Sequence, residues 1–191
     1  MTGQRGYHHG DLRRALLAAA VEAITEAGPA ALSLRDLARR AGVSHAAPAH
    51  HFGDKAGLLT ALAVEGFDLL AGALREAGDL LDAGVAYVRF AVGHRAHFEV
   101  MFRPELYRRD DPEVAAARER AGAALRAGVA LRAGVAALPR DGTDPDQEAD
   151  ALAAWSIVHG FATLWLAGAL PPRTGPDPET AARTVIRRLF D

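Results

Sequence analysis

The sequence predicts an all-α protein of about nine helices, and two observations lead to this prediction. Apolar residues recur at intervals of three and four positions along the chain, and no segment shows the strict alternation of a half-buried β-strand. Glycine and proline interrupt this pattern where helices are expected to end. We expect helices at about residues 9–27, 33–40, 44–52, 54–77, 83–93, 94–103, 112–137, 145–169 and 177–190.

The composition is that of a water-soluble globular protein. Of the 191 residues, 50% are hydrophobic and 24% are charged, which is ordinary for such proteins. The chain has no cysteine, which excludes disulfide bonds and thiolate chemistry and fits a reducing compartment. No apolar run reaches the ~20 residues of a membrane-spanning helix. We therefore expect a cytoplasmic protein with no membrane partner.

Charge is distributed unevenly along the chain. The net charge is −2, yet residues 1–58 carry seven Lys or Arg against five Asp or Glu and hold five of the eight histidines. This region therefore has a formal charge of +2 and the remainder −4. A mildly basic N-terminal region on an acidic body indicates that one end of the molecule binds nucleic acid.

The most informative pattern is SLRDLARRAGVSHAAPAHHFGDK at residues 33–55. Ser33 and Asp36 have the spacing of a capping box, and an apolar helical face follows them. Gly42 then stands where the chain must turn sharply, and glycine adopts positive φ at no steric cost. These features predict a short helix that ends in a tight turn.

Ser44 is expected to cap a second short helix, which continues to about Phe52 and stops at Gly53. Asp54 then caps a third helix. Two short helices around a tight turn, followed at once by a third, form the layout of a helix-turn-helix unit that reads DNA. A plain helical hairpin is the alternative, but two caps and two glycine turns in this order favour the DNA-reading unit.

Residues 9–58 resemble the N-terminal domain of TetR/AcrR-type transcriptional regulators, on the segments SLRDLARRAGVS, HF and GDKAGLL. The segment AWSIVHGFATLWLAGAL at 154–170 resembles the Trp-His-Gly type of ligand-binding domain, mainly on Trp155, His159 and Gly160.

The resemblance implies a ligand-responsive DNA-binding regulator, a repressor released from a palindromic operator by a small-molecule effector. Residues 1–53 would form an N-terminal arm and a three-helix DNA-binding domain, and residues 54–191 a helical effector-binding and dimerisation domain. The homodimer would form through the last two helices, and the effector would move the helix at 54–77. Neither an enzymatic activity nor a cofactor is implied.

The resemblance also assigns a set of DNA-contacting residues. Phosphate contacts are expected from Ser33, Arg35, His50 and Lys55, and Ser44 can pair with a phosphate or a base. Base edges are within reach of His45, Ala46 and Ala47. Apart from the resemblance, DNA recognition is expected to rely also on His51 and on Arg5 and Tyr7 of the N-terminal arm.

The second helix departs from the family at Pro48 and Ala49. Pro48 removes a backbone N–H, and Ala49 replaces a tyrosine that usually binds phosphate in the family. The helix also has no Arg, Lys, Asn or Gln, so we expect weaker sequence readout than is usual.

Aromatic, histidine and methionine side chains of the C-terminal part are the candidates for an effector pocket. They are Phe67, Phe90, His94, Phe98, Met101, Phe102, Tyr107, Trp155, His159 and Trp165. For any one of them, a place in the hydrophobic core is the ordinary alternative.

Two other functions stay open at the level of sequence. The N-terminal histidines could serve a metal-binding protein or an enzyme, but the adjacent pairs 8–9 and 50–51 lack the i, i+4 spacing of a helical zinc pair, so we expect no metal site. The chain could also be a helical scaffold whose DNA recognition is weakened by Pro48 and Ala49.

Overall fold

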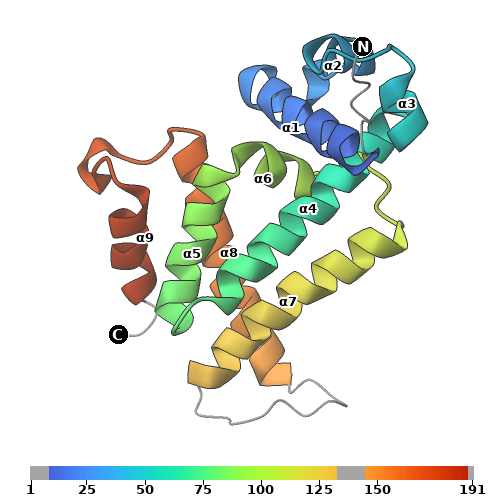
Figure 1. Cartoon of the computed structure of the whole chain (residues 1–191). Coiled ribbons are helices and arrows are strands. Elements are labelled where there is room, and N and C mark those ends of the chain that lie inside the picture. Colours follow the sequence, from blue (N-terminus) through green and yellow to red (C-terminus); the bar gives the residue numbers. More distant parts are fainter. Residues whose placement is uncertain (1–8, 133–144, 189–191) are drawn as a thin grey trace, which may run out of the picture. The chain divides into compact units, whose positions relative to one another are not determined.

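The computed structural model describes residues 9–132 and 145–188. These residues form nine α-helices and three short 3-10 helices, with no strand among them, which confirms the all-α prediction (Figure 1). The α-helices are α1 His9–Ala27, α2 Leu34–Arg40, α3 Ala47–Phe52, α4 Lys55–Arg75, α5 Leu80–Gly93, α6 Arg95–Met101, α7 Pro112–Arg132, α8 Pro145–Leu166 and α9 Pro178–Arg187. The 3-10 helices are η1 Pro29–Ala31, η2 Pro104–Leu106 and η3 Pro172–Thr174.

The helix α3 begins later than predicted, and this corrects the assignment of Ser44 as its N-cap. The capping position is Ala46, and the Ser44 carbonyl accepts a turn hydrogen bond from the Ala47 N–H at 3.0 Å. Pro48 is therefore the second helical residue. Backbone N–H groups of the first turn have no intrahelical partner, so proline is accommodated there without losing a hydrogen bond. Pro48 is thus compatible with a regular start of α3.

The chain divides into two compact units. One comprises residues 1–65 and 96–114, and the other residues 66–95 and 115–191. The helices α4 and α7 each contribute residues to both units. The functional boundary expected between residues 53 and 54 differs from this division and stays a prediction.

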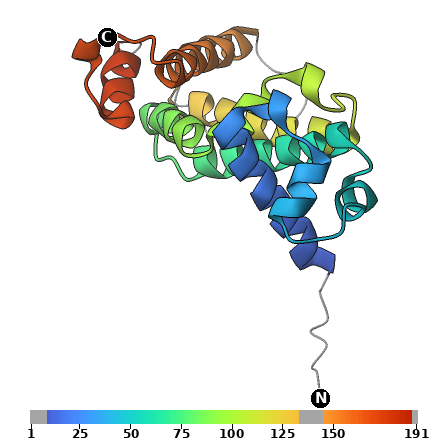
Figure 2. The same ribbon diagram turned by 90° about the horizontal axis from the view of Figure 1, so that it is seen from above.

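In the first unit, α1 packs against α2, and α2 against α3 (Figure 2). Each helix contributes large apolar side chains that are almost fully buried, and α4 supplies several more. Burying a leucine or isoleucine side chain contributes about 1.5–3 kcal/mol. The buried set includes Leu16, Ile24, Leu37, Phe52, Leu58, Leu59 and Leu62.

The helix α4 is long and apolar enough to cross a membrane, the only such helix among the described residues. Of its most apolar window, 56% is buried inside the protein, which is the behaviour of a core helix.

In the second unit, α5 packs against both α8 and α9 (Figure 1). Asp79 caps α5, since its side chain accepts a hydrogen bond from the Asp82 N–H at 2.7 Å. Gly84 permits close packing, because a Cβ at this position would lie 2.8 Å from Cδ1 of Ile186 on α9. Seven further residues of α5 are buried, so this helix forms the centre of the second unit.

Candidate nucleic-acid interface and effector domain

The turn after α2 has the geometry that the sequence predicts. Gly42 adopts φ +65°, and its N–H donates to the Arg39 carbonyl at 3.3 Å. The N–H of Val43 donates to the Ala38 carbonyl at 3.0 Å. These two bonds close a Schellman motif, in which positive φ favours glycine over any residue with a Cβ. The chain thus leaves α2 through a sharp turn that leads into the segment before α3.

The N-terminus of α2 differs in its chemistry from the predicted capping box. Ser33 occupies the N-cap position in an extended conformation, but its side chain makes no capping hydrogen bond to any described residue. Asp36 instead accepts hydrogen bonds from Arg39 at 2.6 Å and Arg40 at 2.8 Å. Hydrogen bonds between charged partners are stronger than neutral ones, so the two guanidinium groups outcompete the backbone N–H for this carboxylate.

Arg40 joins α2 to α1. Its guanidinium group lies 2.8 Å from the Glu26 carboxylate on α1 and 2.8 Å from the Asp36 carboxylate. Hydrogen bonds from Arg40 lower the pKa of Glu26 and of Asp36, and the same carboxylates raise the pKa of Arg40. Arg39 and Arg40 thus have intramolecular partners, while Arg35 is exposed in the first turn of α2.

The segment between Gly42 and Gly53 divides into an exposed and a buried side. Pro48 and Phe52 are buried and hold α3 to the unit. The guanidinium group of Arg13 on α1 lies 5.4 Å from the centre of the Phe52 ring, in a cation–π contact. The exposed side chains are Ser44, His45, Ala46, Ala49 and His50, whereas Ala47 and His51 are half-buried.

Lys55, the first residue of α4, is half-buried and donates from Nζ to the Ala30 carbonyl at 2.9 Å. This contact ties α4 to η1, a structural role that the sequence did not indicate. An ammonium group has three donors, so a phosphate contact by Lys55 is compatible with this bond and stays a prediction. Arg5 and Tyr7 of the arm lie outside the described residues.

The structure also bears on the rival metal site. The rings of His50 and His51 meet edge to face, with their centres 5.5 Å apart. Within the part of the chain that the structure describes, no group of three or more His, Cys, Asp or Glu side chains is placed to hold a metal ion.

The ten predicted effector-pocket residues are divided between the two units. Phe98, Met101, Phe102 and Tyr107 belong to the first unit, and Phe67, Phe90, His94, Trp155, His159 and Trp165 to the second. Five of them are buried core residues, and only His94 is exposed. Their assignment to a ligand pocket stays a prediction.

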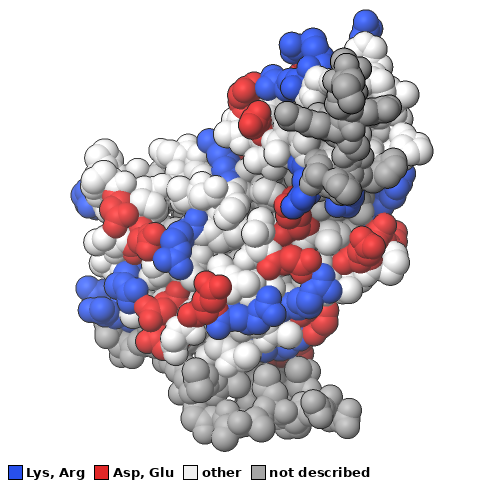
Figure 3. Space-filling view, in the orientation of Figure 1, with Lys and Arg blue, Asp and Glu red and all other residues white. Residues whose placement is uncertain are grey.

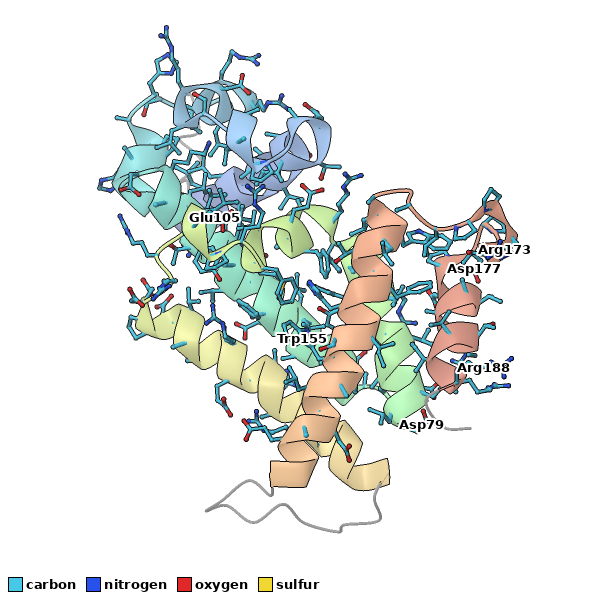
Figure 4. All side chains as sticks on the ribbon, turned by 180° about the vertical axis from the view of Figure 1, so that it is seen from behind. Asp79, Glu105, Trp155, Arg173, Asp177 and Arg188 are labelled. Carbon is cyan, nitrogen blue, oxygen red and sulfur yellow. The ribbon has the colours of Figure 1, made fainter. Side chains whose placement is uncertain are left out.

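Tyr87, a residue outside the predicted set, organises the polar interior of the second unit. It is 1% exposed, and its hydroxyl lies 2.9 Å from Nδ1 of His159. The indole Nε1–H of Trp155, labelled in Figure 4, donates to the same hydroxyl at 3.2 Å. The hydroxyl oxygen accepts from Trp155, while the direction of its bond with His159 Nδ1 follows the tautomer of the histidine ring. Burial raises the pKa of Tyr87 and lowers that of His159, so it favours the neutral form of both side chains.

A surface groove lies along α9 and is lined by none of the ten predicted residues. Its lining combines polar and apolar surface and carries both charges, and two of the lining residues, Asp177 and Arg188, are labelled in Figure 4. Two ion pairs cross from α5 to α9, namely Asp82 with Arg183 at 2.7 Å and Arg89 with Glu179 at 3.8 Å. On the face drawn in Figure 3, basic and acidic side chains are interspersed in the same way.

A helix-turn-helix unit with an exposed recognition segment, combined with a second helical unit, defines a DNA-binding transcriptional regulator. Comparison with known proteins agrees with this class. A family model for bacterial regulatory proteins of the tetR family matches residues 16–62, and one for the tetracyclin repressor-like C-terminal domain matches residues 80–189. The chain belongs to the tetR family of bacterial regulatory proteins. The Trp-His-Gly subtype stays a prediction.

Solved structures share the fold over almost the whole chain. A protein of unknown function from Rhodococcus sp. RHA1 is 35% identical, with 98% of this chain and 97% of that chain covered and a TM-score of 0.77. The TetR family transcriptional regulator PfmR from Thermus thermophilus is 26% identical. The match covers 90% of this chain and 94% of PfmR, with a TM-score of 0.63. The TetR-like regulator LfrR from Mycobacterium smegmatis, solved in complex with proflavine, is 21% identical. The match covers 92% of this chain and 94% of LfrR, with a TM-score of 0.60. No protein of curated function matches the sequence.

Proposed function

We propose that this regulator is a homodimeric, cytoplasmic repressor that leaves a palindromic operator when a small-molecule effector binds. The observation that carries the proposal is the exposed side of the recognition segment, residues 44–50. It presents two histidines, His45 and His50, and small side chains, while the buried Pro48 and Phe52 hold the segment to the unit. In this proposal His45, Ala46 and Ala47 meet base edges, and Arg35 contacts the DNA backbone.

Apolar surface on the last two helices supports a homodimer. Leu152 and Leu164 on α8 are 57% and 47% exposed, and Val185 on α9 is 41% exposed. The other face of α8 is already occupied by the core of the second unit, which contains Val158 and Ala162. Large exposed apolar side chains on adjacent helices are typical of an interface, and a second copy of the chain would cover them.

A dimer also explains how an effector would act. Two recognition helices must fit half-sites whose centres lie about 34–36 Å apart, or a multiple of this distance, so a small change in their separation weakens binding. LfrR, which shares this fold, was solved in complex with the small molecule proflavine, and this supports the proposal that an effector binds the present regulator. No catalytic step is part of the proposed function.

DNA selection with the full-length protein tests the proposal. Duplexes are selected from a random library, and binding to the selected and a scrambled duplex is measured by fluorescence anisotropy at several salt concentrations. We expect preference for the selected duplex by at least about 10³-fold. The variant His45→Ala should lower this preference by roughly 5- to 100-fold. Micromolar, salt-insensitive binding without preference would instead identify a scaffold that has lost DNA recognition.

A further inference from the structure

The loop between α6 and α7 lies on the end of the recognition helix. Tyr107 anchors this loop, because its buried hydroxyl donates to the Met101 carbonyl at 2.9 Å. The next residue, Arg108, donates from its backbone N–H to Oγ1 of Thr60 on α4 at 3.1 Å, and Thr60 donates to the Ala56 carbonyl at 2.7 Å. All of these residues belong to the first unit.

The side chain of Arg108 extends to the junction of α3 and α4, residues 53–57. Its Nη2 lies 3.1 Å from Oδ2 of Asp54. The other carboxylate oxygen of Asp54 accepts the Gly57 N–H at 2.8 Å, which caps α4. The pKa of Asp54 is lowered, mainly by the hydrogen bond from Gly57 and also by the charge of Arg108. One carboxylate thus joins the start of α4 to the α6–α7 loop.

The guanidinium group of Arg108 lies beside two glycines of this junction, Gly53 and Gly57. A Cβ at Gly53 would lie 3.7 Å from Nη2 of Arg108. A Cβ at Gly57 would lie 3.1 Å from Nη1 and only 2.0 Å from the Phe52 carbonyl oxygen. Gly53 also adopts φ +77°, where α3 stops. The junction is therefore compact, and Arg108 lies against it directly beyond the last residue of the recognition helix.

From these contacts we infer that Arg108 is a positioning residue for DNA binding. It holds the junction 53–57 and so fixes the direction in which α3 leaves the core, without itself contacting DNA. The loop that carries Arg108 leads directly into α7, whose later residues belong to the second unit. Displacement of this loop would loosen the junction and lower DNA affinity. The inference rests on the proposed function of α3 in reading DNA.

The test compares Arg108→Ala, Arg108→Lys and the neighbouring control Arg109→Ala in the full-length protein. Arg109 is exposed, and its partner among the described residues is the adjacent Asp110, at 3.4 Å. Dissociation constants for the selected duplex are measured from low to moderate salt, with thermal midpoints as a check of folding. We expect Arg108→Ala to weaken binding roughly 3- to 30-fold, Arg108→Lys to restore part of the loss, and Arg109→Ala to change little.

The salt dependence separates positioning from direct contact. A residue that neutralises a phosphate contributes about 0.9 to the slope of log K against log salt concentration, so a positioning residue should leave this slope unchanged. A slope reduced by about that amount in Arg108→Ala would overturn the inference in favour of a phosphate contact. Unchanged affinity in Arg108→Ala would also overturn it, while the proposed function would stand. Failure of the unsubstituted protein to prefer any duplex would contradict the proposed function itself.

A second variant keeps the test valid if Arg108→Ala unfolds. Asparagine is as good an N-cap as aspartate, so Asp54→Asn keeps the cap of α4 through one oxygen and replaces the oxygen that faces Arg108 by an amide NH2, which removes both the charge and the acceptor of this contact. We expect Asp54→Asn to weaken DNA binding without a change in salt slope. The double variant Asp54→Asn with Arg108→Ala should lose little more than either single variant, since both remove the same contact. Fully additive losses would show that the two residues act separately.

Discussion

The hydroxyl of Tyr87 on α5 lies 2.9 Å from Nδ1 of His159 on α8, and the two residues are 72 positions apart in the sequence. This bond connects two helices at the centre of the second unit. Because Tyr87 is buried, its hydroxyl needs hydrogen-bond partners, and Trp155 and His159 supply them. The Trp-His pair of α8 thus has a structural role that does not depend on any ligand.

The substitution Tyr87→Phe should destabilise the second unit. It removes the acceptor of the Trp155 N–H and the hydrogen-bond partner of His159 Nδ1, at a cost of about 1–3 kcal/mol. For a chain of this length, the thermal midpoint should fall by roughly 2–10 °C in calorimetry. Combining it with His159→Asn should cost less than the sum of the two single substitutions. An unchanged midpoint in Tyr87→Phe would show that the bond contributes nothing to stability.

Stability should fall in mildly acidic solution, partly because of His159. Burial lowers the pKa of His159 from its usual value near 6.5. As pH falls below this value, the unfolded chain takes up a proton that the folded protein resists, so the free energy of unfolding decreases. This contribution is fully present above pH 6.5 and is lost as pH falls toward the folded-state pKa. Between about pH 7.5 and 5.5, the midpoint of His159→Asn should therefore decrease less than that of the unsubstituted protein.

The substitution Arg35→Ala should weaken DNA binding without changing base preference. If Arg35 contacts a phosphate, its loss lowers affinity for all duplexes and reduces the salt slope by about 0.9. Anisotropy titrations of selected and scrambled duplexes at several salt concentrations measure both effects. Arg89→Ala is a suitable control, because Arg89 is an exposed arginine of α5 whose partner is Glu179 on α9. Equal slopes in Arg35→Ala and Arg89→Ala would remove Arg35 from the interface.

Two glycines of α4 should respond to alanine in opposite directions. At Gly57 a Cβ would lie 2.0 Å from the Phe52 carbonyl oxygen, so Gly57→Ala should displace the end of α3 and cost at least about 1–3 kcal/mol. At Gly72 a Cβ would have no atom within 4 Å among the described residues, so Gly72→Ala should stabilise the helix by about 0.5–1 kcal/mol. Chemical denaturation measures both changes, and Gly57→Ala should also lose DNA affinity.

The substitution Leu164→Glu should dissociate the proposed homodimer. Leu164 is 47% exposed on α8, so a charge is tolerated in the isolated chain but not in an apolar interface with a second copy. Light scattering coupled to size-exclusion chromatography should show a dimer for the unsubstituted protein and a monomer for this variant. Arg173→Gln, at an exposed position of η3, lowers the net charge by the same one unit and serves as a control for the change in charge. A dimer that survives Leu164→Glu would place the interface elsewhere.

The helices were predictable because their determinants are local. Apolar spacing and the stops at Gly28, Gly42 and Gly53 place α1, α2 and α4 within two residues of the structure. The start of α3 was not predictable from Ser44 alone, since the position of Pro48 in the first turn decides it. The prediction of a capping box was wrong because Arg39 and Arg40 bind the Asp36 carboxylate in place of the backbone N–H. The sequence spacing of Ser33 and Asp36 does not take account of these two arginines.

The polar contacts of the site depend instead on residues far apart in the sequence. Asp54 and Arg108 are 54 positions apart, and no local pattern pairs them. The sequence does hold one indication of the role of Tyr87, because this residue stands within the largely apolar segment GVAYVRFAV. A hydroxyl buried with such a segment needs a hydrogen-bond partner. The identity of that partner follows only from the packing of α5 against α8.

The two positive-φ glycines that flank the recognition segment, Gly42 and Gly53, have a consequence for how this protein can diversify. Between them, Pro48 and Phe52 anchor the segment, and five exposed side chains lie outside the core. The side chains at these five positions can be substituted together while the rest of the fold is left intact. New operator preferences could therefore be selected from libraries randomised only there, with little loss of folding competence.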